Sequence, residues 1–231
     1  GIWGESACGG NFGPELKMAG WDGIVFKGAS EKPVFVLIED SRCELHDASD
    51  LWGKDIYQVT DFLKASYGDG KQVKVFAIGR AGENLVKFAG IGNDKGHFAG
   101  RTGMGALMGS KKLKAIVVRG SGVVEPALRE EYSPLLKALI TRVKASVPAQ
   151  ALREMGTDSG MDLGMMTNDV PIKNWTLPQD FDLSFNLGGP SLTEKYLTKA
   201  HSCYACPIAC KRVVKVADGP YKTEEGPGPE Y

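Results

Sequence analysis

The sequence has no surplus of either charge and no long apolar run. Its 231 residues include 28 lysines and arginines and 28 aspartates and glutamates, so the formal net charge at pH 7 is +0. Because this balance gives no electrostatic reason to bind nucleic acid or an anionic membrane, we expect neither partner. No apolar stretch approaches the roughly 18 residues that a membrane-spanning helix needs. The start of the chain also lacks the basic and apolar pattern of a secretory signal, so a cytoplasmic location is expected.

The sequence also lacks an even, dispersed set of cysteines. Three of its five cysteines, Cys203, Cys206 and Cys210, fall in one short segment, and the other two are Cys8 and Cys43. A disulfide scaffold would spread an even number of cysteines over a small secreted domain. Clustered thiols in a chain of this size are instead typical of metal ligands in a reducing compartment.

The clustered cysteines form a C-x2-C-x3-C motif. Three thiolates on one compact segment can hold three corners of a cubane iron–sulfur cluster. Zinc is an alternative, because tetrahedral zinc sites use C-x2-C pairs and His201 lies nearby, although no second pair is present. Three buried free cysteines are the other alternative.

A cubane cluster normally takes a fourth ligand. Cys43 lies on the apolar side of an expected strand and is interpreted as filling the core. Cys8 lies in a glycine-rich loop. The lack of an obvious fourth thiol indicates that the cluster needs more chain than this.

Glycine is abundant, with 30 residues in the chain, well above the average of about 7%. Residues 9–14 lead into a short helix, and residues 99–105 form a similar loop that adds Arg101. Free backbone N–H groups at the start of a helix, together with a guanidinium, suit a phosphate or a pterin-like ring. Ordinary turn glycines and a solvated arginine are the alternative. The spacing of residues 103–109 does not match a dinucleotide-binding fingerprint.

Hydrophobic periodicity predicts an α+β chain. A helical apolar stripe marks residues 55–67, and a short helix is expected at 104–112. The expected strands are 24–26, 34–39, 43–48, 73–78, 85–92 and 113–119.

The character of the sequence changes after this first part, which predicts two domains. Residues 1–121 are expected to form a mixed α/β domain, and residues 122–231 the start of a mostly helical one. The helical part should begin with an amphipathic helix that Pro126 opens and Pro148 ends. Residues 217–230 are rich in glycine, proline and acid, and would form a disordered tail if they ended a natural chain.

Several segments, in the same order along the chain, resemble the aldehyde:ferredoxin oxidoreductase family. They cover nearly the whole chain, which makes the likeness more specific than any single motif. These segments are Gly9-Gly10 with 13–17, then 19–24, 47–54, 82–89, 108–116, the cysteine motif with Pro207, and 225–227 with 229–231. The resemblance identifies the chain as an amino-terminal fragment of a tungsten-containing member, and we expect the fragment alone to be inactive.

The resemblance implies a cofactor set and a reaction. Such enzymes hold tungsten, or molybdenum, between two pterins in an amino-terminal α+β domain, with a [4Fe–4S] cluster nearby. Mg²⁺ bridging the pterin phosphates is a further expectation. The reaction oxidises an aldehyde to a carboxylic acid and passes electrons through the cluster to ferredoxin, and a homodimer or a separate electron-transfer subunit is an expected assembly.

Site residues carry over only where the motifs match. Gly9 and Gly10 match the first pterin-contact loop. The second loop is matched by Ala99, Gly100 and Arg101, and the cluster ligands by the three clustered cysteines.

The chain departs from the family pattern in two loops and lacks the expected catalytic residues. Ala7 and Cys8 stand where relatives often have Asn and Ser, and His97 and Phe98 stand where many have Arg and Ala. The fourth cysteine and a tungsten-proximal glutamate lie downstream in relatives, so the catalytic residues are unknown and His46 and His97 are interpreted as structural. The alternatives are the tungsten subunit of a related reductase, and a non-catalytic iron–sulfur or zinc-binding module.

Overall fold

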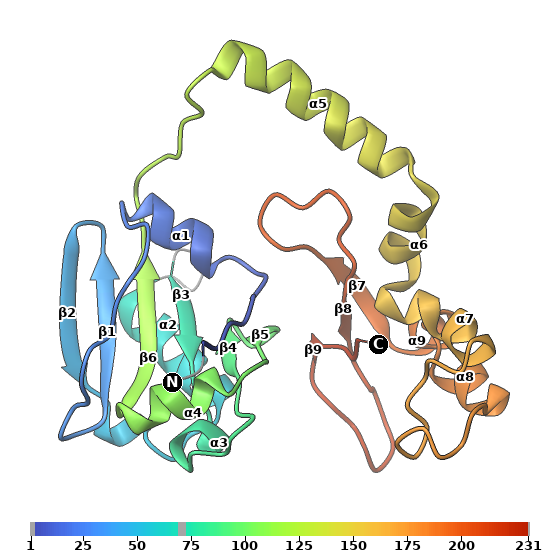
Figure 1. The fold of residues 1–231 in the computed structure, drawn as a ribbon, viewed down its shortest axis with the longest axis horizontal. Coiled ribbons are helices and arrows are strands. Elements are labelled where there is room, and N and C mark those ends of the chain that lie inside the picture. Colours follow the sequence, from blue (N-terminus) through green and yellow to red (C-terminus); the bar gives the residue numbers. More distant parts are fainter. Residues whose placement is uncertain (1–2, 69–72, 231) are drawn as a thin grey trace. The chain divides into compact units, whose positions relative to one another are not determined.

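The computed structural model describes residues 3–68 and 73–230, and the chain divides into two compact units, Gly1–Glu125 and Pro126–Tyr231. The first unit is built on a six-stranded sheet, and the second contains a three-stranded sheet (Figure 1). The strands of the first unit are β1 (Val34–Glu39), β2 (Arg42–Asp47), β3 (Lys74–Ala77), β4 (Ile91–Asn93), β5 (His97–Ala99) and β6 (Leu113–Arg119). Its helices are α1 (Phe12–Met18), η1 (Ser49–Leu51), α2 (Ile56–Tyr67), α3 (Arg80–Glu83) and α4 (Met104–Ser110).

The larger sheet is mixed, which confirms the expected α+β class. Its strand order is β2-β1-β6-β3-β4-β5, with β1 and β6 parallel and every other neighbouring pair antiparallel. The central strand β6 is buried along all but its last residue. A continuous apolar strand of this kind is covered on both faces, as its sequence indicates.

Helices cover both faces of this sheet, because alternate residues of a strand point to opposite sides. Phe35 of β1 packs with Leu63 of α2 in one core cluster. Its neighbour Val36 belongs to a second cluster, with Leu16 of α1 and Met108 of α4 packed in it. The sheet therefore lies between α2 on one side and α1 and α4 on the other.

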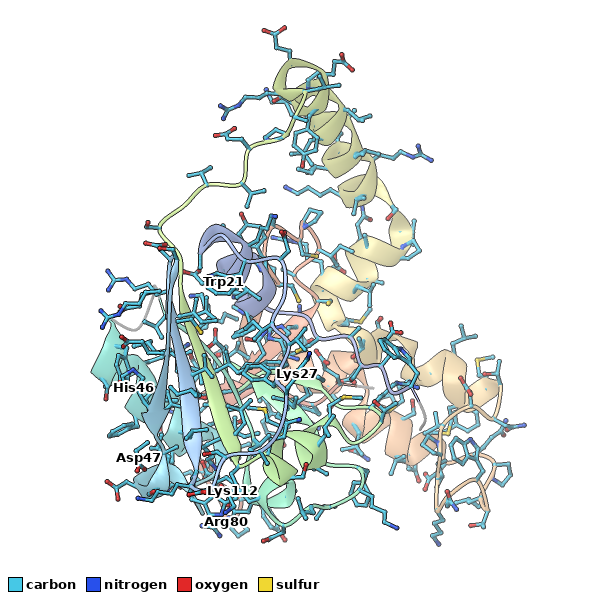
Figure 2. All side chains as sticks on the ribbon, turned by 60° about the vertical axis from the view of Figure 1, so that its left-hand side comes forward. Trp21, Lys27, His46, Asp47, Arg80 and Lys112 are labelled. Carbon is cyan, nitrogen blue, oxygen red and sulfur yellow. The ribbon has the colours of Figure 1, made fainter. Side chains whose placement is uncertain are left out.

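A buried ion pair joins β6 to α3. The Lys114 side chain is fully buried and its ammonium group pairs with Glu83, which is 5% exposed. Lys114 Nζ also donates to the carbonyl of Lys54 at 2.8 Å, and Glu83 accepts from Gly53 N at 2.8 Å. Arg80, labelled in Figure 2, donates from Nε to Gly53 O at 2.6 Å. The pair thus anchors the loop before α2 to the sheet.

The second unit contains one long helix, several short helices and a small antiparallel sheet. Its helices are α5 (Arg129–Ala145), α6 (Val147–Met155), η2 (Thr157–Gly160), α7 (Met161–Met166), α8 (Phe181–Leu187) and α9 (Gly189–Lys195). Its strands are β7 (Leu197–His201), β8 (Lys211–Val214) and β9 (Gly226–Pro227), with β8 between the other two.

Two predicted strands of the first unit are wrong. Residues 24–26 contain no strand, because Phe26 contributes its side chain to the core without backbone pairing. Residues 85–92 are largely a turn, and β4 begins only at Ile91. Leu85 has a left-handed φ of 57°, which ends α3 and prevents an extended run there.

The interpretation of Cys43 as a core residue is also wrong, because its side chain is exposed. It lies on β2, one of the two edge strands of the sheet, beside Leu45, which is 70% exposed. On the opposite face of β2, His46 stacks on Phe35 with ring centroids 5.1 Å apart. The apolar side of the alternating pattern therefore points away from the core.

One expectation for the second unit is wrong, and two features of the unit were not predicted. Pro148 does not end a helix but occupies the first turn of α6, where the missing N–H costs nothing. No strand was expected in this unit, yet β7, β8 and β9 form the small sheet. Part of the 217–230 segment is also held in place, because β9 pairs with β8 and Gly228 N donates to Arg212 O at 2.9 Å.

Candidate functional site

The two glycine-rich segments predicted to bind a cofactor lie side by side in the first unit. Asn93 Nδ2 donates to Gly9 O at 2.7 Å, and Arg101 N donates to Ser6 Oγ at 3.0 Å. Thr102 Oγ1 donates to Glu5 O at 3.1 Å. These bonds join residues more than eighty positions apart in sequence, so the tertiary fold assembles one continuous loop surface.

The first loop is tightly constrained at Gly10. This residue has a φ of 94°, and a Cβ there would lie 2.5 Å from Asn93 Nδ2 and 3.0 Å from His97 Nδ1. Glycine is therefore required both by conformation and by space. Asn93 Oδ1 is buried and accepts no hydrogen bond from the described residues.

The predicted residues of the second loop differ in their exposure to solvent. Ala99 is buried at the end of β5, whereas Gly100 and Arg101 are exposed. Because Gly9 is exposed as well, backbone and guanidinium groups of both loops are accessible at one edge of the sheet. The arrangement fits a ligand with several acceptor oxygens and an extended ring.

Not every glycine of the second cluster serves a ligand. A Cβ on Gly109 would lie 2.0 Å from Gly82 O, and one on Gly105 would lie 2.3 Å from Gly90 O. These glycines let α4 pack directly on α3 and on the loop before β4. Close helix packing, rather than ligand contact, explains this part of the pattern.

In the second unit, the three clustered cysteines occupy the loop of a hairpin. Strands β7 and β8 pair up to His201 and Lys211, so the chain between them forms a closed loop. All three cysteines are half-buried. The hairpin thus presents three thiols from one anchored segment.

The backbone of this loop is unusual directly before two of the cysteines. Ala205, before Cys206, has a φ of 53°, and Ala209, before Cys210, has a φ of 58°. Left-handed backbone at a residue with a Cβ costs about 1 to 3 kcal/mol and is concentrated at functional sites. Cys206 N also donates to Cys203 O at 3.1 Å, which closes the first turn.

The thiols lie within electrostatic range of one another. Burial raises the pKa of the Cys210 thiol, and the charges of Glu230, Cys206 and Cys203 raise it further. No three His, Cys, Asp or Glu side chains within residues 3–68 and 73–230 are grouped closely enough to hold a metal ion. Binding of a cluster would therefore require these side chains to turn toward a common centre. The soft donor set fits an iron–sulfur group.

The other two cysteines lie in the first unit. Cys8 lies in the loop before α1 and is partly buried against the core there, and Cys43 is exposed on β2. Sequence reasoning missed Asn93, Lys211 and Arg212. The available signals were an amide side chain at the end of β4, and two adjacent cations directly after the third cysteine of the motif.

A cavity of about 390 Å³ lies in the second unit, beside the small sheet. Its walls are mainly apolar side chains, and Glu230 lies at its edge, held by Lys211 at 2.8 Å. Lys211 directly follows the third cysteine. The lining is Asp158, Met161, Asn186, Leu187, Leu192, Tyr196, Val214, Val216, Pro229 and Glu230.

A family model described as the N-terminal domain of aldehyde ferredoxin oxidoreductase matches residues 1–120. The chain belongs to the aldehyde ferredoxin oxidoreductase family. A second model, for domains 2 and 3 of aldehyde ferredoxin oxidoreductase, matches residues 135–231. The family resemblance read from the sequence is therefore confirmed.

Three relatives of this chain show how similar it is to other proteins of related name. The tungsten-containing aldehyde ferredoxin oxidoreductase of Thermococcus kodakarensis is 42% identical over 218 residues, which is 92% of this chain and 36% of that protein. The protein of the same name from Pyrococcus furiosus is 39% identical over 224 residues, covering 96% and 36%. The WOR-like subunit of an aliphatic sulfonate oxidoreductase, also from Pyrococcus furiosus, is 30% identical over 233 residues, covering 95% and 36%. The chain thus spans about a third of the length of these relatives.

A solved structure shares the fold. The active site complex BamBC of benzoyl coenzyme A reductase, in complex with 1,5-dienoyl-CoA, matches with a TM-score of 0.73 and 30% identity. The match covers 93% of this chain and 34% of that one.

In the part of the chain that the structure describes, no helix is long and apolar enough to cross a membrane.

Proposed function

We propose that this chain is part of an enzyme that oxidises aldehydes to carboxylic acids at a tungsten centre held by two pterins. Electrons would leave through a [4Fe–4S] cluster to ferredoxin. The observation that carries the proposal is the hairpin loop with three neighbouring thiols, in a chain of this family whose two glycine segments are hydrogen-bonded into one surface. A cytoplasmic location and a homodimer or electron-transfer partner remain predictions.

The residues of the first unit would bind and orient the pterins. The exposed backbone at Gly9 and Gly100 can approach a planar ring, while Gly10 fixes the turn that follows. Arg101 can make paired hydrogen bonds to a phosphate. Asn93 holds the Gly9 carbonyl in place. Mg²⁺ between the pterin phosphates is an additional prediction.

The residues of the second unit would hold the cluster and exclude water. Cys203, Cys206 and Cys210 would supply three thiolates, and a fourth ligand would come from elsewhere. The tungsten group, when bound, supplies the two-electron redox chemistry. The net change converts an aldehyde and one water into a carboxylic acid, two protons and two electrons.

The cavity beside the small sheet could hold a small, mainly apolar molecule. Apolar side chains form most of its wall, and its volume of about 390 Å³ lies within the range of small-molecule sites. Glu230, paired with Lys211, gives one polar edge.

A second candidate is the tungsten subunit of a related reductase. It is supported by the fold shared with the benzoyl coenzyme A reductase complex at 30% identity. The two candidates differ in the substrate that exchanges electrons with the enzyme. Reduction of a viologen dye that depends on an aldehyde would favour the aldehyde oxidoreductase. If no aldehyde reduces the dye, but reduced viologen drives the reduction of an aryl-CoA thioester, the reductase would be favoured.

The decisive experiment is metal and pterin analysis of the full-length protein, expressed anaerobically with tungstate. We expect about four iron atoms per chain, together with tungsten and pterin. The Cys206→Ser variant should lose most of the iron, because one corner of the cluster loses its soft ligand. Cys43→Ser is the matched control and should keep the iron, since Cys43 lies outside the motif and is exposed.

Zinc at about one atom per chain, without iron and pterin, would refute the proposal and support a zinc-binding module. Iron without tungsten or pterin would support a non-catalytic iron–sulfur module instead.

A further inference from the structure

Arg212 is the most deeply buried cation of the second unit that the structure describes, at 1% exposed. It is the second residue of β8, two positions after the last cysteine of the motif. Burying a guanidinium is costly unless its N–H groups find partners. The hydrogen-bond acceptors of the Arg212 guanidinium therefore indicate the role of this side chain.

The guanidinium joins the cysteine loop to the end of α6. On the loop, Arg212 Nη2 donates to Ala209 O at 2.8 Å and Nε donates to Cys210 O at 3.2 Å. On α6, Nη2 donates to Arg153 O at 2.9 Å and Nη1 to Glu154 O at 3.0 Å. One side chain thus fixes the turn that carries the third cysteine against a helix terminus.

The surroundings are shaped to receive this side chain. Gly156, just after α6, has a φ of 76°, and a Cβ there would lie 3.1 Å from both Arg212 Cγ and Cys210 O. Ala209, whose carbonyl accepts a hydrogen bond from Arg212, has a strained left-handed φ. The hydrogen bonds therefore stabilise a backbone that would otherwise relax.

The charge of Arg212 also interacts with the cysteine. The guanidinium is 1% exposed and lies against the turn of the third cysteine, since it donates to Cys210 O at 3.2 Å and to Ala209 O at 2.8 Å. A cation in a low-dielectric setting stabilises nearby negative charge more strongly than it would in water.

We propose that Arg212 is a positioning residue for an iron–sulfur cluster on the cysteine motif, anchoring the turn of Cys210 and favouring the reduced cluster through its buried charge. The inference rests on the proposed cluster. Arginine combines both parts, whereas lysine supplies the charge but cannot reach four carbonyl oxygens with a planar fork.

The test compares Arg212→Met and Arg212→Lys with wild type in the full-length protein, expressed anaerobically. Iron content, cluster retention against a chelator and the cluster midpoint potential by EPR titration are measured. Arg142→Met is the matched control, because Arg142 is an exposed residue of α5 outside the cysteine loop. Circular dichroism shows whether each variant is folded.

We expect both Arg212 variants to retain the cluster about 10- to 100-fold less well, as when a group that orients a metal ligand is removed. In the loaded fraction, Arg212→Met should shift the midpoint potential downward, whereas Arg212→Lys should stay near wild type. Arg142→Met should change neither quantity. A merely structural role would not separate the potentials of the Met and Lys variants.

Wild-type retention and potential in both Arg212 variants would overturn the inference while leaving the cluster itself intact. Absence of iron from wild type would instead refute the proposed function. If Arg212→Met does not fold, Arg212→Lys decides: weaker retention at a near-wild-type potential supports the inference, and wild-type retention overturns it.

Discussion

At the scale of single residues, the first unit buries the charged side chain of Lys114, which is costly in an apolar core. Burial lowers the pKa of Lys114, while Glu83 opposes the shift by hydrogen bonding and by its charge. Removing one member of a buried pair is costly, because the other charge is left without a partner. Replacing both by apolar groups is often close to neutral.

Lys114→Met should therefore destabilise the protein by about 3 to 5 kcal/mol. The double variant Lys114→Met/Glu83→Leu should recover a large part of that loss. Lys112→Met is the matched control and should cost less than about 1 kcal/mol, since Lys112 is exposed. Urea unfolding of the three variants checks this, and equal losses in the single and double variants would contradict it.

Only some residues of the candidate site could be predicted from the sequence. Gly9 and Gly10 stand out because they lie in a glycine-rich loop before a helix, and the three cysteines because of their C-x2-C-x3-C spacing. Asn93 and Arg212 do not stand out, because their importance lies in hydrogen bonds to backbone carbonyls. Arg212 reaches across almost sixty positions to α6, and no local pattern encodes such a distance.

At the scale of elements, glycine has different consequences in two short helices. On α4, Gly109 lies against α3, with Gly82 O at 2.0 Å from where its Cβ would be. On α1, a Cβ at Gly13 would meet nothing within 4 Å. The same residue type is thus required by packing in one helix and unconstrained in the other.

Gly109→Ala should destabilise the protein by at least about 1 to 3 kcal/mol, the usual cost of forced overpacking. Gly13→Ala should be neutral or stabilise it by up to about 1 kcal/mol, because alanine is the better helix former. Thermal unfolding of both variants is the measurement. A Gly109→Ala variant as stable as Gly13→Ala would show that α4 does not pack on α3 in this way.

At the scale of the whole molecule, many large apolar side chains are exposed. Phe185 is 86% exposed, Phe88 is 82% exposed, and no residue of α5 is buried. Such a number of exposed apolar side chains is typical of a chain with an interface or an aggregation liability. Because folded proteins are only marginally stable, uncovered apolar surface has a large effect.

The isolated 231-residue chain should accordingly aggregate or unfold without a sharp transition. Light scattering after size exclusion, together with calorimetry, tests this, and full-length protein serves as the comparison. A monodisperse monomer that melts cooperatively would contradict the expectation.

The sequence by itself determined those features that arise from neighbouring residues. Helix α2 and strands β1 and β6 lie where periodicity placed them, because side-chain spacing within an element is local. The tertiary structure decided the rest. The exposed position of Cys43 depends on β2 being an edge strand, and the small sheet depends on β8 finding two partners. Strand pairing and side-chain bonds to distant carbonyls are long-range interactions, and only the folded chain brings those groups together.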